Sequence, residues 1–205
     1  FCYGYSTKPE KDADGYDLFN PLWKVDCNEP HYRKDKSGKK IPYATPPGPS
    51  ELIGTPVLYD EKIYCAIGQD PEHGDGVGRL SCIDAKTGNV VWKNTDIGRT
   101  ISTVSVADDL VYLAEYAGIV HCLDAQTGKV YWTHDSFSRI WGSSLVADGK
   151  LLLGNEDGDL LILDHGKKKP KVQTVGMGAP VYSSPVFVNG TLYVATQTHL
   201  YAIGN

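Results

Sequence analysis

The chain has 205 residues, a formal net charge of −5 and a hydrophobic fraction of 41%. This composition supplies enough apolar material for one sizeable core. It lacks the basic stripe with interleaved aromatic residues that nucleic-acid binding requires, and no apolar run reaches the length of a transmembrane helix. We therefore expect no nucleic-acid partner and no transmembrane segment. The 22 glycines and 12 prolines favour a turn-rich, all-β protein.

Residues 1–51 contain two predicted strands, at 1–5 and 22–27, with a long polar loop between them. Residues 28–51 form a predicted extended polar connection. The first part of this connection is rich in lysine and arginine, and the second part contains Pro42, Pro46, Pro47 and Pro49. We interpret residues 1–51 as a partial blade with long polar loops.

Residues 52–205 repeat with a period of about 40 residues. The segments 78–92 and 118–132 share an apolar run followed by Asp-Ala-x-Thr-Gly-x-x-x-Trp, and a weaker copy begins at Gly158. Each repeat contains four short predicted strands, A to D, which is typical of a blade of a β-propeller. We therefore predict four-stranded antiparallel blades at 52–96, 97–135 and 136–175, and an incomplete blade at 176–205.

The predicted chain thus contains two strands, three complete blades and three further strands, or about four blades in all. An open arc of this kind leaves unpaired strand edges at both ends. Closed propellers contain about four to eight blades. We therefore expect the chain to be part of a larger propeller, completed by further blades of the same polypeptide or by a partner chain.

The repeated motif resembles the pyrroloquinoline-quinone-like (PQQ-like) repeat family over roughly residues 52–204. This family includes quinoprotein dehydrogenases and the non-enzymatic propeller lipoprotein of the outer-membrane β-barrel assembly machinery. The resemblance implies a β-propeller and a periplasmic or extracellular bacterial location. It also implies structural roles for the blade-motif residues Asp84, Gly88, Trp92, Asp124, Gly128 and Trp132.

The enzymes of this family typically carry an adjacent cysteine pair, a calcium ion held by Asp, Asn and Glu, and a Trp that stacks on the quinone. No two cysteines are adjacent in this chain, and the sequence motifs of common hydrolases and zinc peptidases are absent. We therefore expect no bound PQQ and a binding or protein-assembly scaffold. The alternative is a fragment of a quinoprotein-type or metal-dependent oxidoreductase whose active residues lie largely outside this chain.

Candidate binding residues lie in the predicted D–A and B–C connections, which share one rim of a propeller, conventionally its top. We call this rim the loop rim, and we call the opposite rim, made by the A–B and C–D turns, the turn rim. Loops on a rigid scaffold are where binding chemistry concentrates. The candidate residues for a ligand or partner surface are Asp70, Glu72, His73, Asp75, Arg99, Glu115, Arg139, Trp141, Glu156, Asp157 and Tyr182.

Two interpretations stay open for the charged members of this set. The arginines could hold an anionic ligand, or they could neutralise Glu115, Glu156 or Asp157 in neighbouring loops. Asp70, Glu72, His73 and Asp75 could bind a divalent ion such as calcium, or they could form a solvated loop.

The odd count of five cysteines argues against a complete disulfide framework. A two-residue turn at Asp157-Gly158 would set the pairing of strands B and C in the third blade. If the equivalent residues of the first blade pair in the same way, Cys65 lies directly opposite Cys82. Directly opposed residues share a face of the sheet. We therefore expect these two sulfur atoms to be in contact, as a pair of thiols or as a disulfide.

Overall fold

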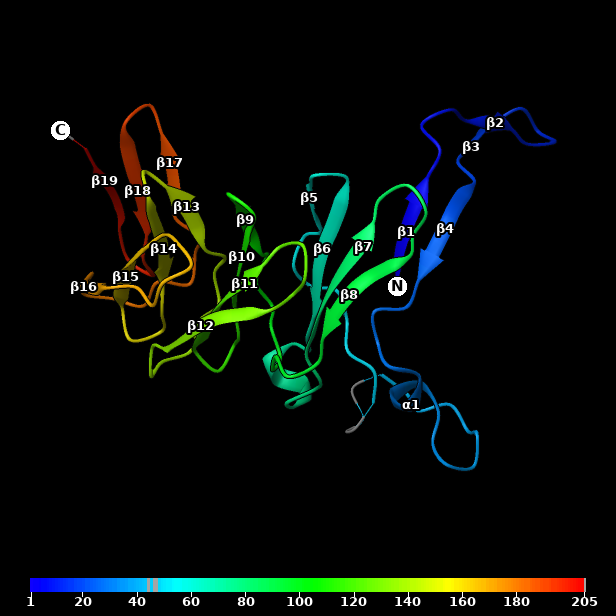
Figure 1. Ribbon diagram of the computed structural model, residues 1–205, viewed down its shortest axis with the longest axis horizontal. Helices are drawn as coiled ribbons and strands as arrows, with labels where there is room; N and C mark the ends of the chain where they lie inside the picture. Colours follow the sequence, from blue (N-terminus) through cyan, green and yellow to red (C-terminus); the bar gives the residue numbers. More distant parts are fainter. Residues whose placement is uncertain (44, 46–47, 205) are drawn as a thin grey trace.

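The computed structural model describes residues 1–43, 45 and 48–204. Pro46, Pro47 and Asn205 lie outside the described residues. The described chain forms a row of antiparallel sheets that follow one another in sequence order (Figure 1). A small hairpin and one short helix are added near the N-terminus.

The N-terminal sheet pairs β1 (Cys2–Tyr5) with β4 (Pro21–Val25), as the sequence predicts. The intervening segment contains a short hairpin of β2 (Glu10–Lys11) and β3 (Asp17–Leu18) in place of a simple loop. The connection after β4 is also more regular than expected, because it contains the one-turn helix α1 (Pro30–Arg33).

Three four-stranded blades and one three-stranded sheet follow, in agreement with the repeat analysis. The first blade contains β5 (Val57–Tyr59), β6 (Lys62–Ile67), β7 (Arg79–Asp84) and β8 (Val90–Asn94). The second contains β9 (Ser105–Ala107), β10 (Leu110–Ala114), β11 (Ile119–Asp124) and β12 (Val130–Asp135). The third contains β13 (Leu145–Ala147), β14 (Lys150–Gly154), β15 (Asp159–Asp164) and β16 (Val172–Gly176). The last sheet contains β17 (Val186–Val188), β18 (Thr191–Ala195) and β19 (Leu200–Ile203).

The A–B turns are two-residue hairpin turns with positive φ at both central positions. Asp60 and Glu61 have φ of 47° and 58°, and Asp108 and Asp109 have φ of 49° and 59°. Such angles belong to type I′ turns, whose twist matches that of the flanking strands. The Asp and Asn residues at these turns tolerate this conformation better than most side chains. The turn sequences therefore fix the A–B hairpins.

The Asp-Ala-x-Thr-Gly motif forms the C–D turn. The Asp124 carboxylate accepts hydrogen bonds from the backbone N–H groups of Gln126 and Thr127 and from the Thr127 hydroxyl. Gly128 then adopts a φ of 72°, which non-glycine residues rarely take. Asp84 makes the same bonds to Lys86 and Thr87 one blade earlier. The motif is thus a side-chain-stabilised turn.

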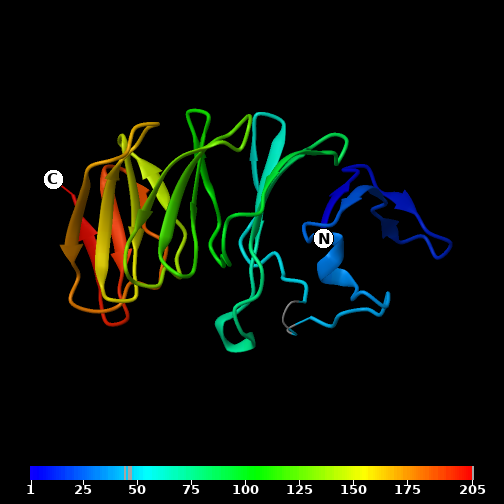
Figure 2. The same cartoon turned by 60° about the horizontal axis from the view of Figure 1, so that its bottom comes forward.

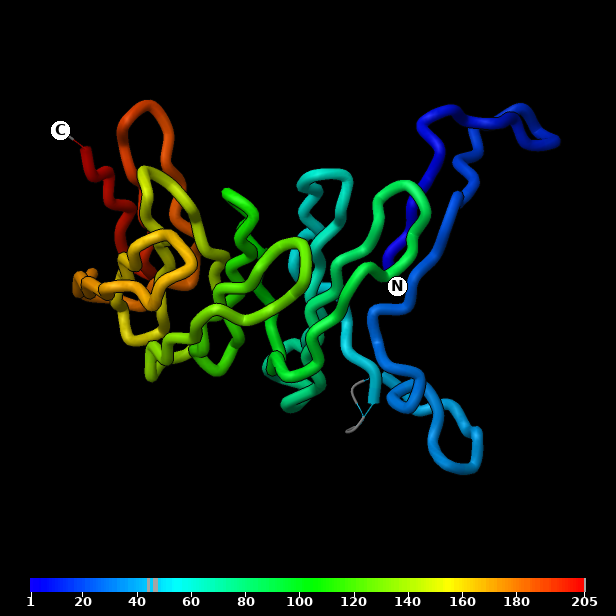
Figure 3. The backbone as a smooth tube through the Cα atoms, in the orientation of Figure 1, coloured from blue at the N-terminus to red at the C-terminus, as the bar shows by residue number. Residues whose placement is uncertain are grey.

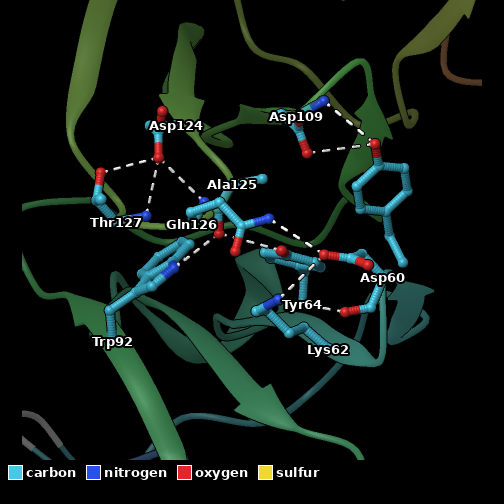
Figure 4. Close-up of polar contacts among 10 residues, drawn as sticks. Asp60, Lys62, Tyr64, Trp92, Asp109, Asp124, Ala125, Gln126 and Thr127 are labelled. Atoms are coloured by element: carbon cyan, nitrogen blue, oxygen red, sulfur yellow. Dashed lines mark hydrogen bonds and ion pairs between the residues drawn. The ribbon is translucent and has the colours of Figure 1, made fainter.

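The Trp of the motif joins each blade to the next. Trp23, Trp92 and Trp132 donate indole hydrogen bonds of 3.0, 2.9 and 2.9 Å to the carbonyl oxygens of Ala85, Ala125 and Gly166. Figure 4 shows this arrangement around Trp92 and Ala125 on the turn rim. The repeat therefore encodes the blade-to-blade contact as well as the blade.

The core lies between blades and uses alternate faces of each strand. Tyr64 and Cys82 of the first blade pack with Leu113 of the second, whereas Tyr112 of the second packs with Leu153 of the third. Because side chains alternate along a strand, neighbouring residues such as Tyr112 and Leu113 serve two different interfaces. Each blade interior is therefore apolar on both faces.

The predicted contact between Cys65 and Cys82 is wrong, because the two strands pair one residue away from the predicted register. Cys82 lies opposite Tyr64, and Cys65 lies opposite Ser81, so the two sulfurs point to opposite faces of the sheet. The same shift occurs in the third blade, where Leu153 pairs with Leu161. The cause is a three-residue B–C loop, Glu156 to Gly158, closed by Gly158 with a φ of 90°. All five cysteines are free thiols.

The sheets stand side by side along an open arc (Figures 2 and 3). The N-terminal and C-terminal sheets lie at opposite ends of it (Figure 1). Within the described residues, β1 pairs only with β4 and β19 pairs only with β18. The arc is therefore not closed by pairing between these two strands. No helix in the described part of the chain has the length and hydropathy needed to cross a lipid bilayer.

Candidate functional site

Main-chain hydrogen bonds hold the D–A and B–C connections together on the loop rim. The N–H groups of Tyr116, Glu156 and Gln197 each donate a 2.8 Å hydrogen bond to the carbonyl oxygens of Arg99, Arg139 and Pro180, respectively. These three bonds recur at about the period of the repeat. Side chains on the loop rim therefore project from a firmly held backbone.

Three aromatic side chains form a continuous row on this rim. Trp141 lies between Tyr116 and Tyr182, with ring centroids 5.1 Å and 5.5 Å apart and interplanar angles of 81° and 77°. Tyr116 is almost fully buried, Trp141 is half-buried, and Tyr182 is 40% exposed. We call Tyr116, Trp141 and Tyr182 the aromatic row. Edge-to-face pairs of this kind are favourable beyond the area that they bury.

Two arginines flank the buried end of the aromatic row. The guanidinium carbons of Arg99 and Arg139 lie 4.4 Å and 5.6 Å from the centre of the Tyr116 ring. Such cation–π contacts fix the direction of an arginine without neutralising it. The Arg139 side chain is 60% exposed, whereas the Arg99 side chain is only 14% exposed. Arg139 is therefore the cation that the row presents to solvent.

Glu156 connects the arginine to the aromatic row. Its carboxylate lies 3.7 Å from a terminal nitrogen of Arg139 and accepts a 3.3 Å hydrogen bond from the indole of Trp141. The neighbouring Asp157 is exposed, and its backbone N–H donates to the Ser138 hydroxyl. The sequence left open whether Arg139 binds an anionic ligand or pairs with a neighbouring carboxylate. In the structure it pairs with Glu156.

Glu115 belongs to the interior of the rim. Its carboxylate accepts a 2.7 Å hydrogen bond from His121 Nε2 and a 2.9 Å hydrogen bond from the backbone N–H of Gly98. The residue is 9% exposed. Glu115 therefore ties the D–A connection to strand β11 and is not available to a partner.

The acidic loop contains a one-turn 3₁₀ helix, η1 (Pro71–His73), at the lower end of β6 and β7 in Figure 1. Asp70 accepts from the backbone N–H of Glu72 and lies 2.6 Å from His73 Nδ1. Desolvation is the largest single effect on Asp70 and acts to raise its pKa, but the hydrogen bonds from His73, the backbone and Tyr43 together outweigh it and lower that pKa. Asp70 and His73 thus form a local pair.

Asp75, another acidic member of this loop, lies next to an arginine instead. The Asp75 carboxylate lies 4.0 Å from Arg99, whose guanidinium also donates to the carbonyl oxygen of Gly74. Within residues 1–43, 45 and 48–204, no three His, Cys, Asp or Glu side chains are arranged to hold a metal ion. The loop brings together two of its four candidate ligands and pairs a third with arginine.

Sequence reasoning missed Tyr116, although its B–C loop was recognised as part of the rim. The residue immediately precedes Ala117-Gly118 in the second blade, where the third blade has Glu156. The available signal was the change of residue type at this loop position, which is aromatic in the second blade and charged in the third. The blade-motif residues Asp84, Gly88, Trp92, Asp124, Gly128 and Trp132 all lie on or beside the turn rim, away from the aromatic row.

Comparison with protein families identifies the repeat. A family model described as outer membrane protein assembly factor BamB matches residues 76–204. The chain belongs to this family of PQQ-like propeller proteins. The match begins in the long B–C loop of the first blade and covers the whole aromatic row. No curated protein sequence matches the chain significantly.

Solved structures agree on the propeller architecture. BamB from Moraxella catarrhalis has a TM-score of 0.62 and 23% identity, over 76% of this chain and 47% of that protein. The chain therefore spans about half the length of that BamB. The computationally designed protein Ika4 gives the same TM-score at 14% identity, over 76% of this chain and 92% of the design. At these identities the likeness establishes the fold alone.

Quinoprotein enzymes are also structural neighbours. A quinohemoprotein alcohol dehydrogenase from Pseudomonas putida has a TM-score of 0.55 and 18% identity, over 72% of this chain and 28% of that enzyme. At this identity the likeness to the enzyme establishes the fold alone. No two of the five buried cysteines are adjacent in the sequence, and Tyr116 and Tyr182 both pack against the ring of Trp141. The Glu156 carboxylate beside Trp141 is paired with Arg139.

Proposed function

We propose that the protein is a binding scaffold that acts in outer-membrane protein assembly without a bound quinone. The observation that carries this proposal is the aromatic row with Arg139 beside it, held on a firmly bonded rim. Tyrosine, tryptophan and arginine are the residues enriched at the energetic centres of protein interfaces. The family description supports the assembly role. A periplasmic or extracellular location is part of the same proposal.

The exposed side chains of the loop rim indicate the chemistry of a complementary partner. Tyr182 and the half-buried Trp141 supply apolar contact area, and Arg139 supplies a cation that is only partly neutralised by Glu156 at 3.7 Å. We expect the partner to be a protein segment that carries an apolar or aromatic side chain next to an acidic one. Further blades of the same polypeptide would cover the open ends of the arc and leave the loop rim free.

The proposal is tested by placing a photoreactive amino acid at Tyr182 in the protein expressed in its own cells. The matched control carries it at Lys168, an exposed residue on the turn rim. We expect a discrete cross-linked protein from position 182, identified by mass spectrometry as an outer-membrane protein or a component of its assembly machinery. Equal adducts from both positions, or none from position 182, would contradict the proposal.

The alternative function is that of a fragment of a quinoprotein-type or metal-dependent oxidoreductase. The dehydrogenase neighbours support it at the level of the fold. It is separated from the scaffold by denaturing the purified protein and analysing the extract for a quinone chromophore and for stoichiometric metal. A quinone in the extract would favour the enzyme, and calcium without quinone would assign the ion to the acidic loop or to another site.

A further inference from the structure

Three of the five cysteines meet at the interface between the N-terminal sheet and the first complete blade. Cys2 comes from β1, Cys27 follows β4, and Cys65 comes from β6. All three belong to one buried cluster, with exposed fractions of 8%, 0% and 1%. The sulfur atoms of Cys27 and Cys65 are 3.7 Å apart. Residues far apart in the sequence thus place two thiols in direct contact.

The other two cysteines have different surroundings. Cys82 packs in the core between the first and second blades, and Cys122 packs in the next core. The Cys122 thiol donates to the carbonyl oxygen of Gly166. These residues occupy one repeat position and fill space as small apolar side chains. The cluster of Cys2, Cys27 and Cys65 does not follow the repeat, so the packing of the blades does not by itself require it.

We propose that Cys27 and Cys65 are a disulfide-forming pair that cross-links the N-terminal sheet to the first blade. A sulfur–sulfur bond of about 2.05 Å requires the two atoms to approach from van der Waals contact. The oxidant is a low-molecular-weight disulfide such as oxidised glutathione. One oxidised glutathione and two protein thiols give one protein disulfide and two molecules of reduced glutathione, so atoms and electrons balance.

Cys2 provides the route by which the oxidant reaches the buried pair, because it is the most exposed of the three thiols. A hydrogen bond from the Cys65 thiol lowers the pKa of Cys2 to about 7, which favours the nucleophilic thiolate. Its attack forms a mixed disulfide and releases one glutathione. Cys65 displaces the second glutathione from Cys2, and the Cys65 proton passes to the departing glutathione thiolate. The Cys27 thiolate then attacks the Cys65 sulfur and releases Cys2.

The cross-link joins residues 38 positions apart in the sequence. It closes a loop that contains α1 and the polar connection to the first blade. The only other covalent link between the N-terminal sheet and the blade is that connection itself. A disulfide at this position would therefore hold the end of the arc together when its noncovalent contacts open.

The test uses the full chain, oxidised with a glutathione redox buffer and compared with the reduced protein. We expect thiol titration in denaturant to fall from five thiols to three. Trypsin cuts after Lys62 and Arg79, so it separates Cys65 from Cys82. Mass spectrometry of the unreduced digest should show the Cys27 and Cys65 peptides joined. The melting temperature should rise by roughly 5–10 °C on oxidation.

Two variants control for the identity of the pair. Cys65→Ala should form no disulfide between two protein cysteines under the same oxidation, any loss of thiol being a glutathione adduct that mass spectrometry identifies, whereas Cys82→Ala should lose two of its four thiols to a protein disulfide. Circular dichroism of both reduced variants checks that they fold, and Cys27→Ala repeats the test from the other side of the pair. Five free thiols in the oxidised wild type, or a disulfide that includes Cys82 or Cys122, would overturn the proposal. A final Cys2–Cys65 bond would overturn the assignment to Cys27.

Discussion

The indole Nε1 of Trp92 and the hydroxyl of Tyr64 both donate hydrogen bonds to the carbonyl oxygen of Ala125, at 2.9 Å and 3.0 Å. The two donors lie in the first blade, and the acceptor lies in the C–D turn of the second (Figure 4). One backbone carbonyl thus receives two hydrogen bonds from the neighbouring blade. Its two lone pairs accommodate both donors.

The shared acceptor leads to a prediction about non-additivity. Trp92→Phe or Tyr64→Phe removes one donor and should each lower the free energy of unfolding by about 1 kcal/mol. The double variant leaves the carbonyl without either donor, so it should cost more than the sum of the two by about 0.5–2 kcal/mol. Urea unfolding of the four proteins measures this coupling. Strict additivity would show that water replaces both donors.

A matched pair of glycines tests the packing of the Trp against the turn. Gly128 and Gly149 have similar φ values of 72° and 68°. A Cβ on Gly128 would lie 2.5 Å from the indole of Trp92, whereas a Cβ on Gly149 would meet nothing within 4 Å. Both substitutions to Ala carry backbone strain, and only Gly128→Ala adds a clash. We expect Gly128→Ala to be less stable than Gly149→Ala by about 1–3 kcal/mol in urea unfolding. Equal losses would show that the indole moves aside.

Glu115 provides a prediction about the loop rim. Glu115→Ala removes the acceptor for both Gly98 and His121 in a largely buried position. We expect a loss of roughly 2–4 kcal/mol in unfolding free energy. Hydrogen exchange of the Gly98 amide should also accelerate, because the loop it belongs to is released. Glu72→Ala, in the exposed acidic loop, is the control and should change stability by less than about 0.5 kcal/mol.

The motif aspartate gives a pH-dependent prediction. The hydrogen bond from Tyr131, with those from Thr127 and the backbone, lowers the pKa of Asp124 below its ordinary value and outweighs desolvation, which acts to raise it. A carboxylate with a lowered folded-state pKa stabilises the protein above its unfolded-state pKa of about 3.9, and this contribution is lost as the pH falls through the folded-state value. Asp124→Asn should therefore destabilise the protein at pH 7 and progressively less below pH 4. Urea midpoints measured from pH 7 to pH 2.5 give the comparison. A difference that stays constant with pH would contradict the expectation.

The sequence was sufficient for the blade order but not for the B–C register. The dipeptide Asp-Gly fits a two-residue turn, and it also fits the last two positions of a three-residue loop. In the third blade the second possibility occurs, because Glu156 belongs to the loop and Asn155 pairs with Asp159. One residue of difference moves every side chain of the strand to the other face. The sequence expectation for Cys65 and Cys82 failed for this reason.

The composition of the candidate site was predictable only in part. Arg139, Trp141, Glu156 and Tyr182 lie together, as expected for residues of adjacent loops on one rim. Glu115 is turned inward to His121, which lies opposite Leu113 in β11 and is therefore diagonal to Glu115 on the same face of the sheet. The register error placed these two residues on opposite faces. The thiol cluster could not be predicted, because Cys2 and Cys27 reach Cys65 through the packing of a partial blade outside the repeat.

Whether the partner binds to the aromatic row is tested most directly by measuring the affinity of variants for that partner. Isothermal titration of the partner identified by cross-linking would compare the wild type with Trp141→Ala, Tyr182→Ala and the turn-rim control Lys168→Ala. We expect Trp141→Ala to weaken binding by about thirtyfold or more, since central interface residues contribute about 2 kcal/mol or more, and Lys168→Ala to leave it unchanged. Circular dichroism confirms that the variants fold. Unchanged affinity in both loop-rim variants would contradict the proposal that the protein binds its partner through the aromatic row.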